Sequence, residues 1–453
     1  MSRRAGPLIA AFAAALACAA GAAEAGAAGF TKARTAAGPS PDVLALGGLS
    51  LARDGTGSVA FLQRDDGEAH VFVSRLAGRT PTQPVRVDGG QLGPSSDVRV
   101  AVADKGQTVV TWINGGQVYG AVERRKGDGF AAPTSLCLCG PVSDPSLDVS
   151  RFGTAYLTFT APGSGGHDVR AATYDEGEWT LLSTPLDIDR SHDAGGASAA
   201  ASSDGTGIAA FTERAGGVTR VYERRLLRTK LSEVPRRASL GELNGHKGGN
   251  ADGADVDIQD DSSYAWVTFR ENFVDGGKPR GRTIAHRLAG SRFDLTSPVD
   301  GLSFPGSQNA VAATVTLAGR GYGMAVTTLG SNELMAGVLT RSRDPLQPTF
   351  EGAVRLQKKQ PSPPFAAASS DDSSHGVAVW ERSGGGKRRI VARYFNGRRF
   401  EKAVKLSPGG AGQTAANLGL DIEGDDAEDH LVAFVQGPAN ARRIQVAAYV
   451  AAR

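Results

Sequence analysis

The feature that most constrains this chain is a repeated pattern with a period near fifty residues. A short apolar run that ends in an aromatic residue recurs along the sequence. The copies are Val59-Ala60-Phe61, Val110-Thr111-Trp112, Leu157-Thr158-Phe159, Ala209-Ala210-Phe211, Val267-Thr268-Phe269, Ala325-Val326-Thr327, Ala378-Val379-Trp380 and Val432-Ala433-Phe434. Successive copies are 51, 47, 52, 58, 58, 53 and 54 residues apart, and only the sixth lacks the aromatic residue.

Each repeat contains three or four short segments in which apolar and polar residues alternate, separated by turns rich in Gly and Asp, as in 373–409. This period of two is typical of strands that bury one face. A fixed repeat of about fifty residues with four short strands is typical of β-propeller blades. The sequence therefore predicts an all-β fold, a single eight-bladed propeller over residues 29–453. Seven blades and one irregular extra repeat is the alternative.

The two ends of the chain predict how the ring closes. The eighth repeat ends directly after its third strand, 444–450, so its fourth strand is missing. Residues 29–34 match residues 399–404, a fourth strand, in residue type. We therefore expect the N-terminal strand to complete the last blade, which would also remove an exposed sheet edge.

The first residues have the pattern of a secretory signal peptide. A basic start at Arg3-Arg4 precedes an Ala-rich run, 8–23, and A-x-A cleavage sites follow within 23–27. We predict a signal peptide over 1–28 and a secreted mature protein. A lipoprotein anchored through Cys18 is the alternative. No later run approaches the length of a transmembrane segment.

The composition narrows the class of partner. Charged residues make up 21% and apolar residues 40%, so the chain is globular. Lys and Arg number 50 against 47 Asp and Glu, a balance that gives no reason to expect nucleic acid. We expect an extracellular protein or a glycan as partner, a monomeric state and no cofactor.

The repeats resemble the blades of secreted bacterial β-propellers of the sialidase-like and lectin-like kind. The resemblance is one of pattern along the whole chain. The segment Ser202-Ser203-Asp204-Gly205-Thr206-Gly207 has only the opening of the sialidase Asp-box S-x-D-x-G-x-T-W. The resemblance therefore implies a fold and carries over no catalytic residue. A glycan-active hydrolase of sialidase-like type stays open as the alternative function, and it would need carboxylates or a Tyr–Glu pair with Arg residues at the central channel.

The longest insertions, Gly241–Gly253 and Glu271–Gly281, are predicted to be loops on the face that carries the blade-to-blade connections. Long loops on a rigid scaffold are common binding elements, although they are also tolerated as slack. The leading hypothesis is a non-catalytic binding scaffold with its ligand site on this face. The candidate binding residues are Asn244, His246, Lys247, Asn272, Lys278 and Arg280.

Cys137 and Cys139 form a candidate disulfide. Residues at i and i+2 of a strand face the same way, with Cα atoms near the upper limit for a disulfide, so a bond needs the backbone to bend. An oxidising compartment favours that bond.

No metal site is predicted. A group formed by Asp189, His192, Asp193 and His246 fits no known ligand spacing. The acidic run within 421–429 is interpreted as a solvated turn, with a calcium site as the alternative.

Overall fold

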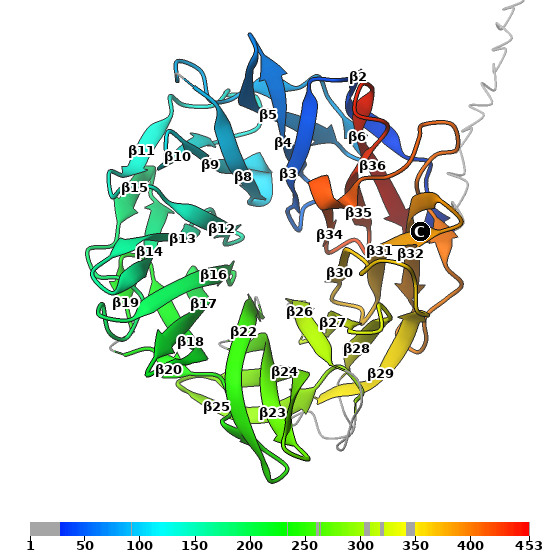
Figure 1. Ribbon diagram of the computed structural model, residues 1–453. Coiled ribbons are helices and arrows are strands. Elements are labelled where there is room, and N and C mark those ends of the chain that lie inside the picture. Colours follow the sequence, from blue (N-terminus) through cyan, green and yellow to red (C-terminus); the bar gives the residue numbers. More distant parts are fainter. Residues whose placement is uncertain are drawn as a thin grey trace, which may run out of the picture.

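The computed structural model describes residues 28–452 apart from 92, 233, 260–261, 263, 303–308, 318–320 and 341–348. Eight antiparallel sheets form a closed ring around a central axis (Figure 1). The prediction of an eight-bladed β-propeller is confirmed, and the seven-bladed alternative is wrong. The predicted signal peptide lies, except for residue 28, outside the described residues.

In every blade the first long strand, which is β22 in blade 5, lies nearest the axis, and the later strands follow outward (Figure 1). Blade 1 contains β3 (Val43–Leu51), β4 (Gly57–Asp65), β5 (Glu68–Ala77), β6 (Thr80–Pro81) and β7 (Val85–Arg86). Blade 2 contains β8 (Ser95–Val102), β9 (Thr108–Asn114), β10 (Gln117–Glu123) and β11 (Thr134–Cys137), with the 3-10 turn η1 (Asp104–Gly106). Blade 3 contains β12 (Ser143–Val149), β13 (Ala155–Gly163), β14 (Gly166–Asp175) and β15 (Glu178–Leu181). Blade 4 contains β16 (Asp193–Ala201), β17 (Thr206–Ala215), β18 (Val218–Leu227), β19 (Lys230–Leu231) and β20 (Arg236–Arg237).

The second half of the ring repeats this order. Blade 5 contains β21 (Glu242–Leu243), β22 (His246–Ile258), β23 (Ala265–Asp275), β24 (Lys278–Ala289) and β25 (Arg292–Pro298). Blade 6 contains β26 (Ala310–Leu317), β27 (Gly323–Leu329), β28 (Leu334–Thr340) and β29 (Thr349–Gln357). Blade 7 contains β30 (Ala366–Ser370), β31 (Gly376–Gly384), β32 (Lys387–Phe395) and β33 (Val404–Lys405). Blade 8 contains β34 (Leu420–Gly424), β35 (His430–Gln436) and β36 (Arg442–Val450), after the 3-10 turn η2 (Ala416–Leu418).

The ring closes as the sequence predicts. Two N-terminal strands, β1 (Gly29–Phe30) and β2 (Arg34–Ser40), pair with β36 and complete blade 8. The Phe30 ring contacts Tyr449 edge-on, with ring centroids 5.1 Å apart. Phe30 is only partly buried, because it lies at the outer margin of the core between blades 7 and 8. Ala36 and Ala37, in β2, are buried against blade 1.

The core lies between neighbouring blades, and the repeated aromatic residues supply much of it. Seven of them are at most 1% exposed, and all stand on the second strand of their blade. They are Phe61, Trp112, Phe159, Phe211, Phe269, Trp380 and Phe434. In blade 6, where the aromatic is missing, Thr327 is also buried and its hydroxyl lies 2.9 Å from that of Thr283 in blade 5.

Tight turns join the second and third strands of most blades. In five of them two residues with positive φ make the turn, which is the type I′ geometry that matches the twist of the flanking strands. Glycine adopts this conformation without steric cost, so glycine dominates these positions. The pairs are Asp66-Gly67, Gly115-Gly116, Gly216-Gly217, Gly276-Gly277 and Gly385-Gly386.

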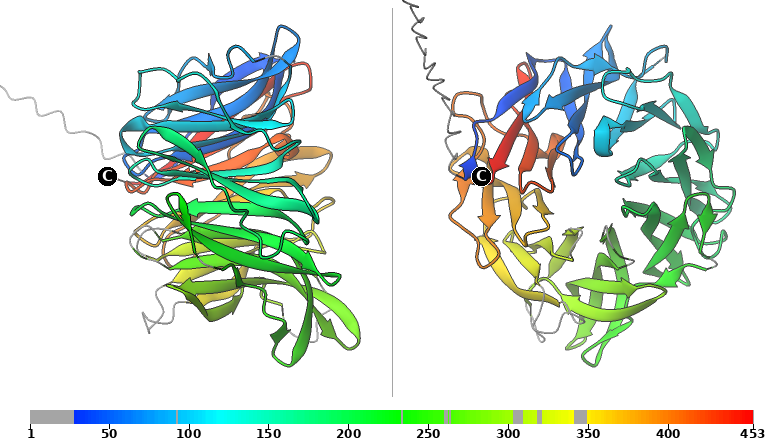
Figure 2. Two further views of the ribbon diagram at one scale, coloured as in Figure 1. Left: turned by 90° about the vertical axis from the view of Figure 1, so that its left-hand side faces the viewer. Right: turned by 180° about the vertical axis from the view of Figure 1, so that it is seen from behind.

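These turns and the blade-to-blade connections open on one face of the ring, called the connection face below. The turns between first and second strands open on the other face, called the turn face. Gly29 is opposite Val450, so the first and last strands of the chain meet at the turn-face end of β36 (Figure 2).

The interpretation of 241–253 and 271–281 as loops is wrong. Most of these residues belong to β21, β22, β23 and β24, and only two short turns remain. Residue pairing continues out to Asp275 and Lys278, because the Gly276-Gly277 turn lets both strands run to their ends. β22, β23 and β24 have 13, 11 and 12 residues and form a projecting arm of blade 5 (Figure 2).

Candidate functional site

The axis of the ring is lined by the first strands of all eight blades, and a narrow cavity of about 170 Å³ lies there. Polar side chains on these strands join neighbouring blades. The Oδ2 atoms of Asp148, Asp257 and Asp421 accept hydrogen bonds from the backbone N–H groups of Ala201, Leu317 and Leu49, at 2.8, 2.6 and 2.9 Å. Each donor lies on the first strand of the next blade, an edge strand whose N–H groups need a partner outside their own sheet. These carboxylates therefore link the blades.

Glu423, on β34, is the exceptional acid of the channel. Burial raises its pKa well above the usual value, and the charges of Asp421, Asp148 and Asp257 raise it further. A carboxyl group held neutral in this way can donate a proton or a hydrogen bond. The mouth of the same cavity also holds Arg53. The channel thus gathers the carboxylate and Arg types that a glycan hydrolase would need.

Blades 7 and 8 meet at a buried group that has the composition of a hydrolase triad. Ser369 Oγ lies 2.7 Å from His430 Nδ1, and His430 Nε2 lies 3.2 Å from Asp371 Oδ2. All three residues are at most 3% exposed, so no substrate reaches the hydroxyl. Burial acts to raise the pKa of Asp371, but the hydrogen bond from His430 and its charge, with backbone N–H donors, hold it below the usual value. The group is a structural link between the blades.

A larger groove, of about 770 Å³, follows the seam between blades 8 and 1 on the turn face. Arg79 forms a hydrogen-bonded ion pair with Asp429 across this seam, and Arg53 lies 3.6 Å from Asp426. The groove walls are therefore neutralised by cross-seam pairs, which support ring closure.

The acidic residues within 421–429, which were considered for calcium, make contacts in different places. Glu423 lines the axial cavity, and Asp421 binds the N–H group of Leu49 in blade 1. Asp425 Oδ1 accepts hydrogen bonds from the N–H groups of Ala427 and Asp429, both at 2.9 Å. In the described part of the chain no group of three or more His, Cys, Asp or Glu residues is placed to hold a metal ion.

The four residues weighed as a metal group bind other partners with their side chains. Asp189 Oδ1 accepts a hydrogen bond from the N–H group of Ser191 at 2.9 Å. His192 Nδ1 lies 2.7 Å from Glu213 Oε1, and Asp193 Oδ1 lies 2.9 Å from His167 Nδ1. His246 Nδ1 lies 3.0 Å from the carbonyl oxygen of Val274. Contacts within adjacent strands and connections account for these side chains.

The six candidate binding residues all lie in the blade 5 arm. Asn244 has φ +52° in the turn between β21 and β22, and Lys247 is opposite Glu242. Lys278 begins β24 next to the tip, and Arg280 is opposite Phe273. The contact of His246 with Val274 holds the β21–β22 hairpin against the β23–β24 hairpin. The structure thus brings the six residues together on one blade, on strands and turns.

Sequence reasoning missed a recurrent buried pair that follows the fourth strands. An apolar residue followed by Asp occurs at Val87-Asp88, Leu186-Asp187 and Val299-Asp300. Each Asp accepts a hydrogen bond from a backbone N–H group of its own third strand. Asp300 also binds Arg282, with both side chains at most 3% exposed. The signal was available, since these dipeptides recur at one position of the repeat.

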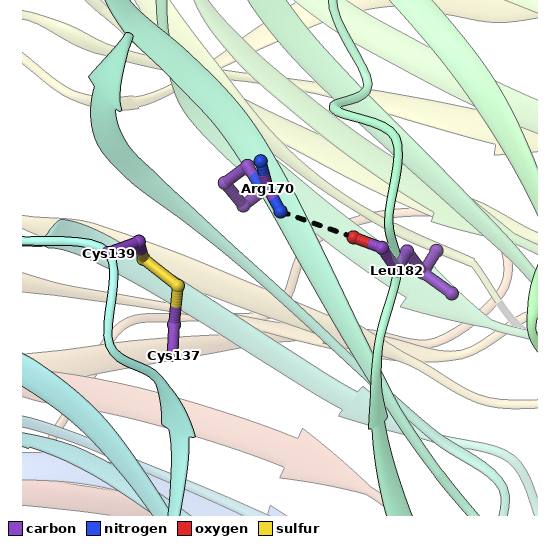
Figure 3. Close-up of a disulfide and its surroundings, with 4 residues drawn as sticks. All are labelled: Cys137, Cys139, Arg170 and Leu182. Carbon is purple, nitrogen blue, oxygen red and sulfur yellow. Dashed lines mark hydrogen bonds between the residues drawn. A yellow bond between two sulfur atoms is a disulfide. The ribbon is translucent and has the colours of Figure 1, made fainter.

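Cys137 and Cys139 are joined by a disulfide in the structure (Figure 3). Their Cα atoms are 5.2 Å apart, which is shorter than an extended strand allows and lies in the range for disulfides. The backbone bends here because β11 ends at Cys137. That this disulfide forms in the native protein stays a prediction, which titration of free thiols can test.

Comparisons with known proteins show the fold alone. No protein family model and no curated protein matches the chain. The Dos1 propeller is 8% identical with a TM-score of 0.52, covering 92% of this chain and 95% of that chain. The polysaccharide lyase Uly1 is 9% identical with a TM-score of 0.46, covering 87% and 88%. A leech intramolecular trans-sialidase is 9% identical with a TM-score of 0.38, covering 87% and 83%. The likeness to the Dos1 propeller supports the β-propeller fold alone.

Within the described residues, no helix has the length and apolar character to cross a bilayer.

Proposed function

We propose that this protein is a secreted, non-catalytic binding scaffold whose ligand, an extracellular protein or a glycan, contacts the connection face. The observation that carries the proposal is the blade 5 arm. Its three long strands exceed the 7–10 residues of the second and third strands elsewhere, so they extend beyond what the shared core needs. The arm exposes Asn244, Lys247 and Lys278, with Val274 46% exposed.

The arm is stiff enough to act as a preformed binding element. Phe273 and Glu271 are fully buried at its base. Glu271 accepts hydrogen bonds from the N–H groups of Leu240 and Gly241 at 2.8 and 3.0 Å, and so fixes the incoming connection. A preformed element loses little conformational entropy on binding, which favours affinity.

The signal-like N-terminus and the disulfide support the secreted part of the proposal, because disulfides persist in oxidising compartments.

A glycan hydrolase is the second candidate, and Glu423 is the observation that favours it. A neutral carboxyl beside Asp148 and Asp257 has the chemical character of a general acid near a carboxylate base. The weakness is that both aspartates already bind the next blade, and the cavity of about 170 Å³ is narrow.

A glycan-array and pull-down screen of the mature protein tests the leading proposal. The variant Lys247→Ala/Lys278→Ala/Arg280→Ala should lose the captured ligand, whereas Arg398→Ala/Arg399→Ala, on the turn face, should retain it. Ligand capture unaffected by the arm variant contradicts the proposal. Release of reducing sugar from an array hit, abolished by Glu423→Gln, would instead establish the hydrolase.

A further inference from the structure

Blades 7 and 8 carry a concentration of positive charge at their connection-face ends. Six residues make up this basic cluster: Arg382, Lys387, Arg388, Arg389, Arg442 and Arg443. The segments 380–390, 404–419 and 436–445 build most of this end and contain one acidic residue, Glu381. The end of β2, where Ser40 is opposite Arg442, adds Asp42. Glu381 is buried, and its Oε1 accepts hydrogen bonds from Thr414 and Ala416. Glu381 is thus bound to the connection, and Asp42 Oδ2 accepts a hydrogen bond from Ser40 Oγ at 2.8 Å, so six basic residues stand against two acidic ones at this end.

The sheet register adds a like-charge pair. Arg382 is directly opposite Arg389 on the hairpin formed by β31 and β32, and both side chains are exposed. Like charges directly opposite each other destabilise an antiparallel pair. Arg382 and Arg389 lie on one face of the hairpin and Arg388 on the other, because successive residues of a strand point to opposite faces.

A pocket of about 580 Å³ lies within the cluster. Arg388 and Arg442 are among its lining residues, and Ala415, Leu418 and Pro438 add apolar surface. β32 and β36, which carry the two arginines, lie side by side in Figure 1 and pack through a shared core cluster.

The pocket walls are fixed by hydrogen bonds between the connection and both hairpins. Gln413 Nε2 donates to the carbonyl oxygen of Gly386 at 3.0 Å. The N–H group of Gly437 donates to the carbonyl oxygen of Gln413 at 2.9 Å. The N–H group of Ala415 donates to Val435 at 3.0 Å. The pocket is therefore preformed and needs little ordering when a ligand enters.

We propose that this pocket binds an acidic saccharide chain, one that bears carboxylate or sulfate groups. The guanidinium groups offer paired N–H donors that match carboxylate and sulfate oxygens. The aliphatic wall suits the C–H face of a sugar ring. This site goes beyond the proposed function, because it lies on blades 7 and 8 and uses no residue of the blade 5 arm.

Two other polyanions fit the pocket less well. Single-stranded nucleic acid is held by stacking of bases on aromatic side chains, and the pocket lining contains no aromatic residue. An anionic membrane is bound by protruding apolar groups beside basic ones, whereas this site is concave.

The experiment measures binding of the mature protein to oligogalacturonate and to dextran sulfate by titration calorimetry, with neutral dextran as the uncharged comparison. We expect both acidic saccharides to bind and neutral dextran to fail. Arg388→Gln and Arg442→Gln should each weaken binding at least tenfold, and Arg388→Lys should weaken it less than Arg388→Gln. Ala439→Trp, at an exposed residue of the lining, should block the pocket without changing any charge.

The matched control is Arg398→Ala/Arg399→Ala. It removes two exposed charges from the opposite end of blade 7 and should leave saccharide binding unchanged. Equal weakening by the control, or full binding by Ala439→Trp, would overturn the proposal. Tighter binding to a single-stranded oligonucleotide or to phosphatidylserine vesicles than to both saccharides would also overturn it. The arm variant Lys247→Ala/Lys278→Ala/Arg280→Ala should bind both saccharides normally, which separates this site from the proposed function.

Discussion

Removing the N-terminal strand should open the ring where the two ends of the chain meet. Deleting residues 29–36 takes away all of β1 and the start of β2, which pair with β36. The lost pairs include Gly29 with Val450, Phe30 with Tyr449 and Arg34 with Val446. β36 then becomes an exposed apolar edge strand, which is prone to pair with other chains.

The single substitution Phe30→Ala sets the scale of the effect. Replacing a fully buried Phe by Ala costs about 3–5 kcal/mol, and the half-buried position of Phe30 reduces this to about 2 kcal/mol, including the edge-on contact with Tyr449. A propeller of about 425 residues unfolds with an entropy near 0.9 kcal/mol/K if it unfolds as one unit. Phe30→Ala should therefore lower Tm by only about 2 °C.

The deletion should lower Tm several times more than the substitution, because it also removes Ala36 from the core and exposes the backbone of β36. Differential scanning calorimetry and size-exclusion chromatography measure the two consequences, lower Tm and aggregation. Phe152→Ala, on a side chain that is 80% exposed, is the matched control and should leave Tm unchanged. A synthetic peptide of residues 28–40 should restore part of the lost stability. A deletion variant that stays monomeric with an unchanged Tm would refute strand-mediated closure.

Four other predictions concern single groups. Arg282→Ala should destabilise the protein by about 3–5 kcal/mol, because it leaves a buried carboxylate unpaired, and an unchanged urea midpoint would contradict this. Glu423→Gln should raise Tm at pH 7. Because folding raises the pKa of Glu423, the unsubstituted protein loses stability as pH rises above about 4.3, the usual pKa of a glutamate. The gain in Tm of the variant should therefore vanish below that pH. A gain that persists at pH 3 would show that the charge is not the cause. The native exported protein should show no free thiol, whereas titration of both Cys137 and Cys139 would exclude their disulfide. Its N-terminus should fall within 26–29, and a start at the initiating Met would rule out the predicted cleavage.

The positions that the sequence predicted correctly share one property, which is that they recur with the repeat. The aromatic residues of the second strands and the Gly-Gly turns are local signals, since period-two alternation and positive φ depend on near neighbours. The closure of the ring could also be predicted from the sequence, because residues 29–34 resemble a fourth strand while the last repeat lacks one.

The blade 5 arm shows where this reasoning fails. Residues 241–253 are rich in Gly and polar residues, a composition that favours a loop. Backbone pairing of β22 with β23, from Gly248 opposite Phe273 to Ile258 opposite Ala265, overrides this preference, and Glu271 holds the preceding residues Leu240 and Gly241. Tertiary hydrogen bonds decided what local composition could not.

The sequence alone determined the repeat, the strands and the way in which the two ends meet. Tertiary structure decided the chemistry of the charged groups. Asp421 binds Leu49 across 372 positions, and Ser369 meets His430 across 61. Such contacts form between blades, where the packing of two sheets sets which side chains touch. Spacing along the chain carries little information about that geometry, because the ring brings distant first strands together around one axis.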